Sequence, residues 1–377
     1  MGPLVELLSD LIAIPSVNPA LAPADDSHTG EEPVTAFLES RARAAGLECR
    51  RSTVLPGRDN LLVRLRPRRP PRKTILLAPH LDTVGGLELP GDLFTPVVNN
   101  GRLFGRGACD TKGSVAAMFS ALLAVARDQP PAETEIVFAG LVDEECGQLG
   151  SRKLAGDGFK ADLAVVGEPT LLNVVTAHKG VLWLRLTTTG KAAHGARPEL
   201  GRNAVHAMAK IVDLLETKYA AQLRRRKHPL LGRATINVGA ISGGTQPNIV
   251  PSQCTISIDR RTLPGERDAV ICKDIRALLK SKRLPAEFDS LQAGPCVPLE
   301  TSPRLPLVAQ FMAVAGQRKP KGVDYFSDAA LLAAGGIPSV LFGPGDIAQA
   351  HTPDEWISIE SLERAEGLLI RFLRSLP

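Results

Sequence analysis

Five short segments of this 377-residue chain contain the side chains best suited to bind a divalent cation. The imidazole and carboxylate groups concerned belong to His80, Asp82, Asp110, Asp143, Glu144, Glu145, Glu168 and His351. Most of these residues come just after a strand-like segment. Because residues at the carboxyl ends of strands in an α/β sheet gather at one edge, we expect them to lie together in one site.

Imidazole together with carboxylate is a ligand set that zinc accepts. Two histidines and three or four carboxylates exceed the needs of one zinc ion, and they would suit two ions that share a carboxylate. Taken singly, a histidine after a strand is more often packed or solvated, and the pair Glu144 and Glu145 could be an exposed loop. The whole set favours two divalent metal ions, most often Zn²⁺, although Co²⁺ and Mn²⁺ tolerate the same ligands.

Other catalytic patterns fit the sequence less well. Ser114 and Ser327 lack the Gly-x-Ser-x-Gly setting of a nucleophile elbow. The Gly-Arg-Gly of residues 105–107 is not followed by the Gly-Lys-Ser/Thr of a phosphate loop. Cys109 and Cys146 flank two of the candidate ligands and are weaker candidates for metal binding themselves. Among these patterns, the set of imidazole and carboxylate groups is therefore the strongest candidate for a functional site.

The overall composition is that of an ordinary globular protein, with enough apolar residues for two domains. Hydrophobic residues make up 44% of the chain, and 377 residues are too many for one typical core. The formal net charge is +5, and two basic clusters at residues 64–73 and 224–227 carry much of the excess. Aromatic residues, at 4%, do not interleave with them, so we expect no nucleic-acid partner.

The sequence also gives expectations about location. The first ten residues contain acids and lack the basic region and cleavage site of a signal peptide. No uninterrupted apolar run reaches the roughly 18 residues that would indicate a membrane span. The six cysteines form no Cys-x-x-Cys pair and are far too sparse for a disulfide scaffold. We therefore expect a cytoplasmic protein with reduced thiols and no membrane contact.

Two kinds of element pattern occur along the chain. In the outer parts, helical segments alternate with short apolar strands, which predicts an α/β domain around a mostly parallel sheet. The helices are expected at residues 4–14, 31–45, 113–126 and 361–376, and the strands at 60–65, 74–78, 135–141 and 161–166. Asp110 and Thr111 are capping candidates for the third helix.

The pattern changes near Lys179. A half-polar strand at residues 181–189 is followed by an amphipathic helix at 201–215, strands at 235–241 and 254–261, and a helix at 266–280. This βαββα order predicts an inserted α+β, ferredoxin-like domain with helices on one side of an antiparallel sheet. We place the insert at residues 179–291 and the α/β domain at residues 1–178 and 292–377.

These motifs resemble the M20 metallopeptidases. The resemblance runs from the first helix to the last and includes the family's signature segments in order, such as Pro-His-Leu-Asp-Thr-Val at residues 79–84 and Ala-His-Thr-Pro-Asp-Glu at 350–355. It implies that His80, Asp110 and Glu168 hold one metal ion. Asp110, Glu145 and His351 would hold the other, so that Asp110 bridges the two ions.

The resemblance implies further roles near the metal ions. Asp82 would hydrogen-bond the imidazole of His80 and fix its tautomer. Glu144 would be the general base that takes a proton from the bridging water. In this family the peptide bond after the bridging aspartate is often cis, so the bond between Asp110 and Thr111 is a candidate.

The insert resembles the family's lid and dimerisation domain, which implies a homodimer. His194, in Ala-Ala-His-Gly-Ala-Arg-Pro at residues 192–198, would reach the partner subunit's active site and stabilise the oxyanion. By the same resemblance, Asn248 and Arg261 would bind the substrate carboxylate, for which a guanidinium is well suited. The alternative for Arg261 is a structural salt bridge with Asp259.

The segment at residues 342–355 is most similar to the acetylornithine deacetylase and succinyl-diaminopimelate desuccinylase branch of the family. The expected substrate is therefore a small N-acyl amino acid, of the N-acetyl-ornithine or N-succinyl-diaminopimelate type. A metallo-dipeptidase or carboxypeptidase of the same family is an alternative, because an enclosing lid would also suit dipeptides. A non-catalytic binding protein that retains the fold is a second alternative, although every ligand and the base are present.

Overall fold

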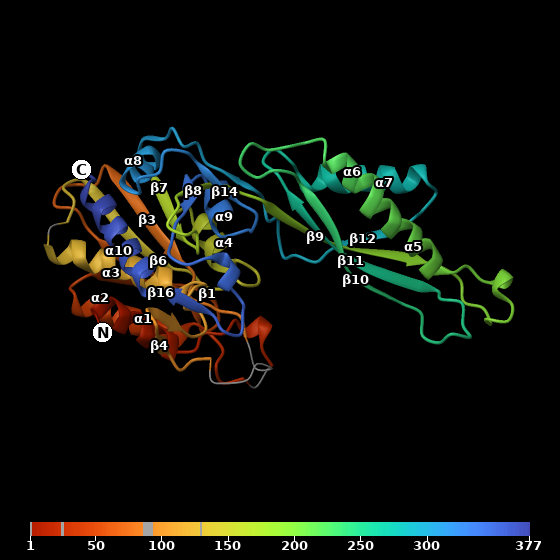
Figure 1. The fold of residues 1–377 in the computed structure, drawn as a ribbon, viewed down its shortest axis with the longest axis horizontal. Helices are drawn as coiled ribbons and strands as arrows, with labels where there is room; N and C mark the ends of the chain where they lie inside the picture. Colours follow the sequence, from red (N-terminus) through yellow and green to blue (C-terminus); the bar gives the residue numbers. More distant parts are fainter. Residues whose placement is uncertain (1, 24–25, 86–92, 129) are drawn as a thin grey trace. The chain divides into compact units, whose positions relative to one another are not determined.

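The computed structural model describes residues 2–23, 26–85, 93–128 and 130–377, which form two compact units (Figure 1). Unit 1 consists of Met1–Thr176, Thr301–Lys321 and Ser327–Pro377, and unit 2 of Ala177–Glu300 with Gly322–Phe326. Each unit has its own cluster of buried apolar side chains. Unit 2 begins at Ala177, close to the predicted start of the insert at residue 179. Unit 1 resumes at Thr301, whereas the sequence placed the end of the insert at residue 291.

The main sheet of unit 1 contains a parallel centre. Its strand order is β1-β2-β6-β3-β7-β15-β8. The parallel strands are β6 (Thr134–Gly140), β3 (Lys73–Pro79), β7 (Leu163–Gly167) and β15 (Ser339–Leu341). The antiparallel strands at the two sides are β1 (Glu48–Leu55), β2 (Arg58–Leu65) and β8 (Val175–His178). This arrangement confirms the predicted α/β class.

Both faces of this sheet are covered, so the central strands β6 and β7 are buried along their whole length and consist mainly of apolar residues. On one face, Ile75 and Leu77 join the core formed with α3 (Lys112–Asp128), against which α1 (Pro3–Ala13) and α10 (Ile359–Arg374) pack. Leu76, whose side chain points to the opposite face, is also fully buried. The helix α9 (Ala329–Ala334) packs against β7 and β15. The other helices of this unit are α2 (Glu32–Ala44), α4 (Leu149–Gly156) and α8 (Pro306–Val314).

Unit 2 is built on an antiparallel sheet of order β10-β11-β9-β12 (Figure 1, mainly green and teal). These strands are β9 (Gly180–Thr189), β10 (Thr235–Gly243), β11 (Gln253–Thr262) and β12 (Glu287–Ser290). Alternate residues of β11, such as Ile256 and Ile258, are buried in a core shared with α5 (Ala204–Leu214) and α7 (Asp268–Ser281). The strand β12 was not predicted and extends the βαββα order by one strand.

Shorter elements complete the two units. A three-stranded sheet has the order β16-β5-β4, and β13 and β14 pair with β8 where the chain passes between the units. Their bounds are β4 (Val97–Asn99), β5 (Arg102–Phe104), β13 (Leu299–Glu300), β14 (Lys321–Val323) and β16 (Trp356–Ser358). The remaining helical turns are η1 (Pro19–Leu21), η2 (Pro198–Leu200), η3 (Leu215–Tyr219), α6 (Ala220–Leu223) and η4 (Ile347–Gln349). None of the helices in the described ranges has the length and apolar character needed to cross a membrane.

Candidate metal centre

Three neighbouring parallel strands deliver candidate ligands to one edge of the main sheet. His80 follows β3 directly, Glu168 follows β7 directly, and residues 143–145 come shortly after β6. The strand ends lie very close together here, since a Cβ atom added to Gly167 would come within 2.8 Å of the Cβ atoms of both Pro79 and Ser114. The parallel pairing of β6, β3 and β7 therefore explains why residues far apart in the sequence meet.

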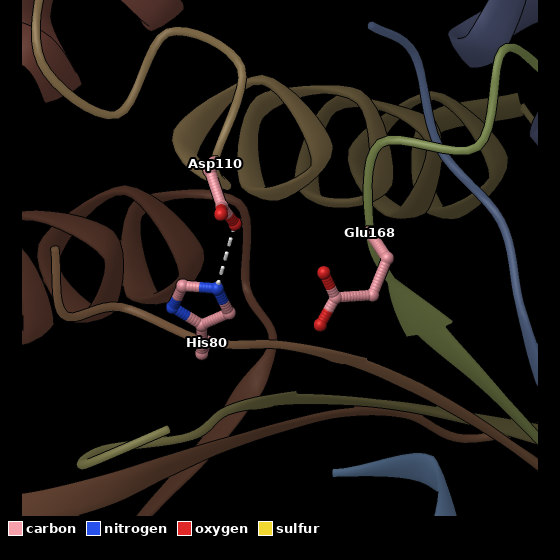
Figure 2. Close-up of side chains that lie close together, drawn as sticks. All are labelled: His80, Asp110 and Glu168. Atoms are coloured by element: carbon pink, nitrogen blue, oxygen red, sulfur yellow. Dashed lines mark hydrogen bonds and ion pairs between the residues drawn. The ribbon is translucent and has the colours of Figure 1, made fainter. Parts of the chain in front are cut away.

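The first cluster contains His80, Asp110 and Glu168, as Figure 2 shows. His80 Nε2 lies 3.2 Å from Asp110 Oδ1, and one ligand atom from each residue lies within 4.8 Å of the others. All three side chains are buried. His80 Nδ1 donates to the backbone carbonyl of Asp82 at 2.9 Å, which leaves Nε2 facing the carboxylates as the ligand atom.

The second cluster contains Asp110, Glu145 and His351. His351 Nε2 lies 3.5 Å from Asp110 Oδ2 and 3.2 Å from Glu145 Oε2. Asp110 therefore offers one oxygen to each histidine and belongs to both clusters. These are the five residues that the family resemblance assigned to two metal ions, and the structure brings all of them together.

The chemistry of these residues fits divalent cations. Glu145 Oε1 and Glu168 Oε1 are buried oxygens without a hydrogen-bond partner in the described part of the chain. Within that part, Asp110 and Glu145 form ion pairs with histidines only. A buried carboxylate oxygen without a partner is costly, and a cation would satisfy it. Two overlapping groups of imidazole and carboxylate ligands fit two such cations.

The pKa values of Glu145, Glu168 and His351 in these clusters are raised, which means that the site favours bound positive charge. Loss of hydration, followed by the negative charge of Asp110, raises the pKa of Glu168 well above its ordinary value. Loss of hydration likewise raises the pKa of Glu145. Hydrogen bonds with Asp110 and Glu145 raise the pKa of His351 to about 10. A cation that binds there would replace this proton, because a histidine ligand must be neutral.

Glu144 is not a member of either cluster, although it precedes Glu145. Loss of hydration, together with the nearby carboxylates of Glu168 and Asp328, raises its pKa well above the ordinary value. A carboxylate with a raised pKa can accept a proton from water near neutral pH, which is the property required of a general base.

Asp82 has further contacts besides the one with His80 that the family resemblance implied. Its carboxylate lies 3.5 Å from His80 Nδ1, at the limit of hydrogen-bond distance, and the Asp82 carbonyl accepts from the same ring nitrogen at 2.9 Å. The carboxylate also accepts from the backbone N–H groups of Glu144 and Glu145, both at 3.0 Å. It therefore fixes the turn that carries the candidate base and one ligand.

Sequence reasoning missed several buried polar residues around the clusters. Asn18 Nδ2 donates to Asp82 Oδ2 at 2.8 Å and to Asp143 Oδ1 at 3.0 Å. Asp328 receives a hydrogen bond from Ser151, and burial raises its pKa to about 7. Asn18 stands in an ordinary Asn-Pro turn signal and Asp328 at the start of a helix, so residue type gave no sign of either.

Two expectations from the sequence concern Asp110 and Thr111. The peptide bond between Asp110 and Thr111 is cis, as the resemblance implied. The two residues have partners other than the start of α3: Asp110 faces the histidines, and the Thr111 hydroxyl donates to the Gly167 carbonyl at 3.1 Å. These contacts of the two side chains therefore reach distant residues, and the expected capping of α3 stays a prediction.

The remaining predicted residues, His194, Asn248 and Arg261, belong to unit 2. The segment of His194 lies against that of Asn248, since the Gly195 N–H donates to the Asn248 carbonyl at 2.7 Å. Arg261 lies on β11 and forms an ion pair with Asp259 at 3.0 Å. Both partners are about one-third exposed (31% and 30%), so this contact leaves the guanidinium accessible.

Comparisons with known proteins give a consistent result. Residues 76–375 match the family described as Peptidase family M20/M25/M40. An acetylornithine deacetylase from Myxococcus xanthus is 30% identical over 354 residues, which cover 90% of each chain. An M20 family metallo-carboxypeptidase from Sulfolobus solfataricus has a similar structure, with a TM-score of 0.80, 19% identity and 99% coverage of both chains. A Bacillus subtilis protein described as a dinuclear metal binding peptidase of the M20 family has a TM-score of 0.72 at 15% identity, with 98% of this chain and 96% of that chain covered.

Proposed function

The chain belongs to peptidase family M20/M25/M40, and on that premise we propose that this metal-dependent hydrolase uses two divalent cations to cleave the amide bond of a small N-acyl amino acid. The observation that carries the proposal is the shared position of Asp110. Its two carboxylate oxygens face His80 and His351, each of which belongs to a separate group of three ligands. Zn²⁺ is the proposed ion, since imidazole and carboxylate are among its usual ligands.

Bound cations would lower the pKa of a water molecule towards neutrality and polarise the scissile carbonyl. In this proposal Glu144 accepts a proton from the attacking water and passes it to the leaving amine. Burial raises the pKa of Glu144 above its ordinary value, which makes its carboxylate a better proton acceptor. Asp82 holds Glu144 in place by accepting its backbone N–H.

The proposed substrate class rests on the curated relatives. The Myxococcus xanthus relative is named an acetylornithine deacetylase and matches over 90% of both chains. We therefore propose N-acetyl-ornithine or a similar N-acyl amino acid, such as N-succinyl-diaminopimelate. Asn248 and Arg261 are the proposed ligands of the substrate carboxylate, and the partly exposed guanidinium of Arg261 suits that role.

Three further parts of the proposal follow from the family resemblance. The insert would serve as a lid and dimerisation domain, and the protein would be a homodimer in which His194 stabilises the oxyanion. A cytoplasmic location agrees with the six free cysteines.

Hydrolysis of peptides is the second candidate function. The similarity to a protein from Aspergillus clavatus that is named a probable carboxypeptidase favours this function. That protein is 30% identical over 312 residues, which cover 77% of this chain and 72% of the relative. The candidate metal centre would serve equally for an N-acyl amino acid and for a dipeptide, because both reactions cleave an amide bond.

The test is hydrolysis of a small panel by the Zn²⁺-loaded protein, with and without a chelator. The panel contains N-acetyl-ornithine, N-succinyl-diaminopimelate, other N-acetyl amino acids and dipeptides. Chelator-sensitive cleavage of an N-acyl amino acid is the expected result and identifies the acyl group. Cleavage of dipeptides alone would favour the second candidate, and no cleavage at all with two zinc ions bound would contradict both.

A further inference from the structure

Glu355 has a carboxylate that is saturated with hydrogen-bond donors. Its Oε1 accepts from the backbone N–H groups of Cys109 at 2.8 Å and Asp110 at 2.9 Å. Its Oε2 accepts from the Gly107 N–H at 2.9 Å and from Arg106 Nη1 at 2.8 Å. The residue is only 3% exposed, so these four contacts replace its hydration.

The same carboxylate joins two segments that carry metal-ligand candidates. Glu355 comes four residues after His351, while three of its four donors are the backbone of the loop that ends in Asp110. Further bonds connect the segments: the Gly105 N–H donates to the Glu355 carbonyl at 3.0 Å, and Arg106 Nη1 donates to the Thr352 carbonyl at 3.2 Å. Through Glu355, the position of Asp110 is tied to that of the His351 segment.

We propose that Glu355 is a positioning residue for the metal centre, which sets Asp110 between His80 and His351 so that both ligand groups can form. The inference rests on the proposed two-metal function. It assigns to Glu355 no contact with substrate or with the metal ions. Its effect passes through the backbone N–H of Asp110, whose side chain belongs to both clusters.

The chemistry of the contact explains why a carboxylate is needed. Both of its oxygens accept two hydrogen bonds, and the negative charge strengthens each of them. The Glu355→Gln variant has nearly the same shape, but its NH₂ group would face two N–H donors. The variant would therefore lose two hydrogen bonds, and the loop that carries Asp110 would shift away from the repelling donors.

A matched control is available elsewhere in unit 1. Glu135, on β6, is also buried at 6% exposure, and it pairs with Arg64, whose Nη1 lies 3.0 Å from both carboxylate oxygens. Among the described residues, its side-chain hydrogen bonds go to Arg64, which belongs to neither ligand cluster. Glu135→Gln therefore removes a buried carboxylate from an arginine pair, as Glu355→Gln does, without touching the Asp110 loop.

The experiment compares the full-length wild type, Glu355→Gln and Glu135→Gln by Co²⁺ titration of the metal-free proteins, followed by the visible absorption of bound Co²⁺. Hydrogen exchange of the metal-free proteins over residues 105–112 is measured in parallel. We expect Glu355→Gln to bind Co²⁺ between about tenfold and a hundredfold more weakly, with a changed absorption spectrum. Its amides at residues 107–110 should also exchange faster, while Glu135→Gln keeps the wild-type spectrum, affinity and exchange.

Wild-type Co²⁺ affinity and spectrum in Glu355→Gln would overturn the inference. So would an equal loss of Co²⁺ binding in Glu135→Gln, which would show a general effect of removing a buried carboxylate. Failure of the proposed function looks different, because the wild type would then bind two Co²⁺ ions but hydrolyse no member of the substrate panel, and the difference between the two variants would persist.

Discussion

Glu144 and Glu145 are neighbours in the chain but have different surroundings. The Glu145 carboxylate lies 3.2 Å from His351 and belongs to a ligand cluster, whereas Glu144 belongs to neither cluster and has a raised pKa. Both backbone N–H groups are held by Asp82, so a side-chain change at either position leaves the turn in place. The two residues can therefore be tested against each other.

We predict that Glu144→Gln binds metal like the wild type and loses activity. The amide cannot take a proton, so kcat should fall by roughly 10² to 10⁴. Glu145→Gln is the matched control and should lose metal ions instead, because it removes a ligand. Metal content by mass spectrometry and kcat on the best panel substrate are the measurements. Wild-type kcat in Glu144→Gln would exclude this residue as the base.

His178, the last residue of β8, makes the stability of the protein depend on pH. Its ring is fully buried, Nδ1 donates to the Lys179 carbonyl at 2.8 Å, and Phe326 packs edge-on at 5.4 Å. Burial lowers its pKa to about 4. Between pH 6.5 and 4 the unfolded chain therefore binds a proton that the folded chain does not. The stability that the neutral ring contributes is fully present above pH 6.5 and is lost as the pH falls towards 4.

The predicted loss is roughly 3 kcal/mol over that interval, since one pKa unit corresponds to about 1.4 kcal/mol. His178→Asn retains an N–H donor near the position of Nδ1 and does not titrate. Urea unfolding of the metal-free proteins should show the difference between wild type and variant shrinking as the pH falls from 7 to 4.5. A difference that stays constant with pH would contradict the assignment.

At the level of elements, strands with a strong internal pattern could be predicted and weakly patterned ones could not. The apolar runs of β6 and β7 and the alternation in β9 are visible in the sequence, because burial on two faces or on one face dictates residue type. The strand β1 has the sequence Glu-Cys-Arg-Arg-Ser-Thr-Val-Leu and is formed by its pairing with β2 in a register that residue types do not reveal.

In the candidate metal centre, the ligand residues could be predicted from the sequence, and the residues that support them could not. His80, Asp110, Glu145, Glu168 and His351 are among the eight candidates that residue type and position after a strand select, and the family resemblance reduces the eight to these five. The residues that hold them in place could not be selected in this way. Asn18 donates a hydrogen bond to Asp143, which is 125 residues away in the sequence. Glu355 accepts hydrogen bonds from backbone N–H groups, among them that of Asp110, 245 residues away. Such hydrogen bonds depend on how distant segments meet, which local sequence does not encode.

At the level of the whole molecule, the two units have separate cores. Each unit contains one of the two tryptophans of the chain. Trp356 lies on β16 in unit 1, and Trp183 lies on β9 in unit 2. Replacing either one by phenylalanine leaves a fluorescence reporter in a single unit. All candidate metal ligands belong to unit 1.

We predict that Zn²⁺ stabilises the unit reported by Trp356 and leaves the unit reported by Trp183 unchanged. A ligand that binds only the folded state adds about 2.7 kcal/mol at one hundred times its Kd. In Trp183→Phe, Zn²⁺ should therefore raise the thermal midpoint, and a chelator should reverse the rise. Equal shifts from both reporters would show that the units unfold as one.

The division of unit 1 into three chain segments has a consequence for protein synthesis. His351 and β15, which pairs with β7, leave the ribosome long after His80, Asp110 and Glu168. At about 5–20 residues per second, the interval between His80 and His351 is roughly 15 to 55 seconds. The whole segment Ala177–Glu300 of unit 2 emerges during that time. The nascent chain thus contains Asp110 and Glu145 before His351 exists, and the second ligand group can be completed only after His351 has been synthesised.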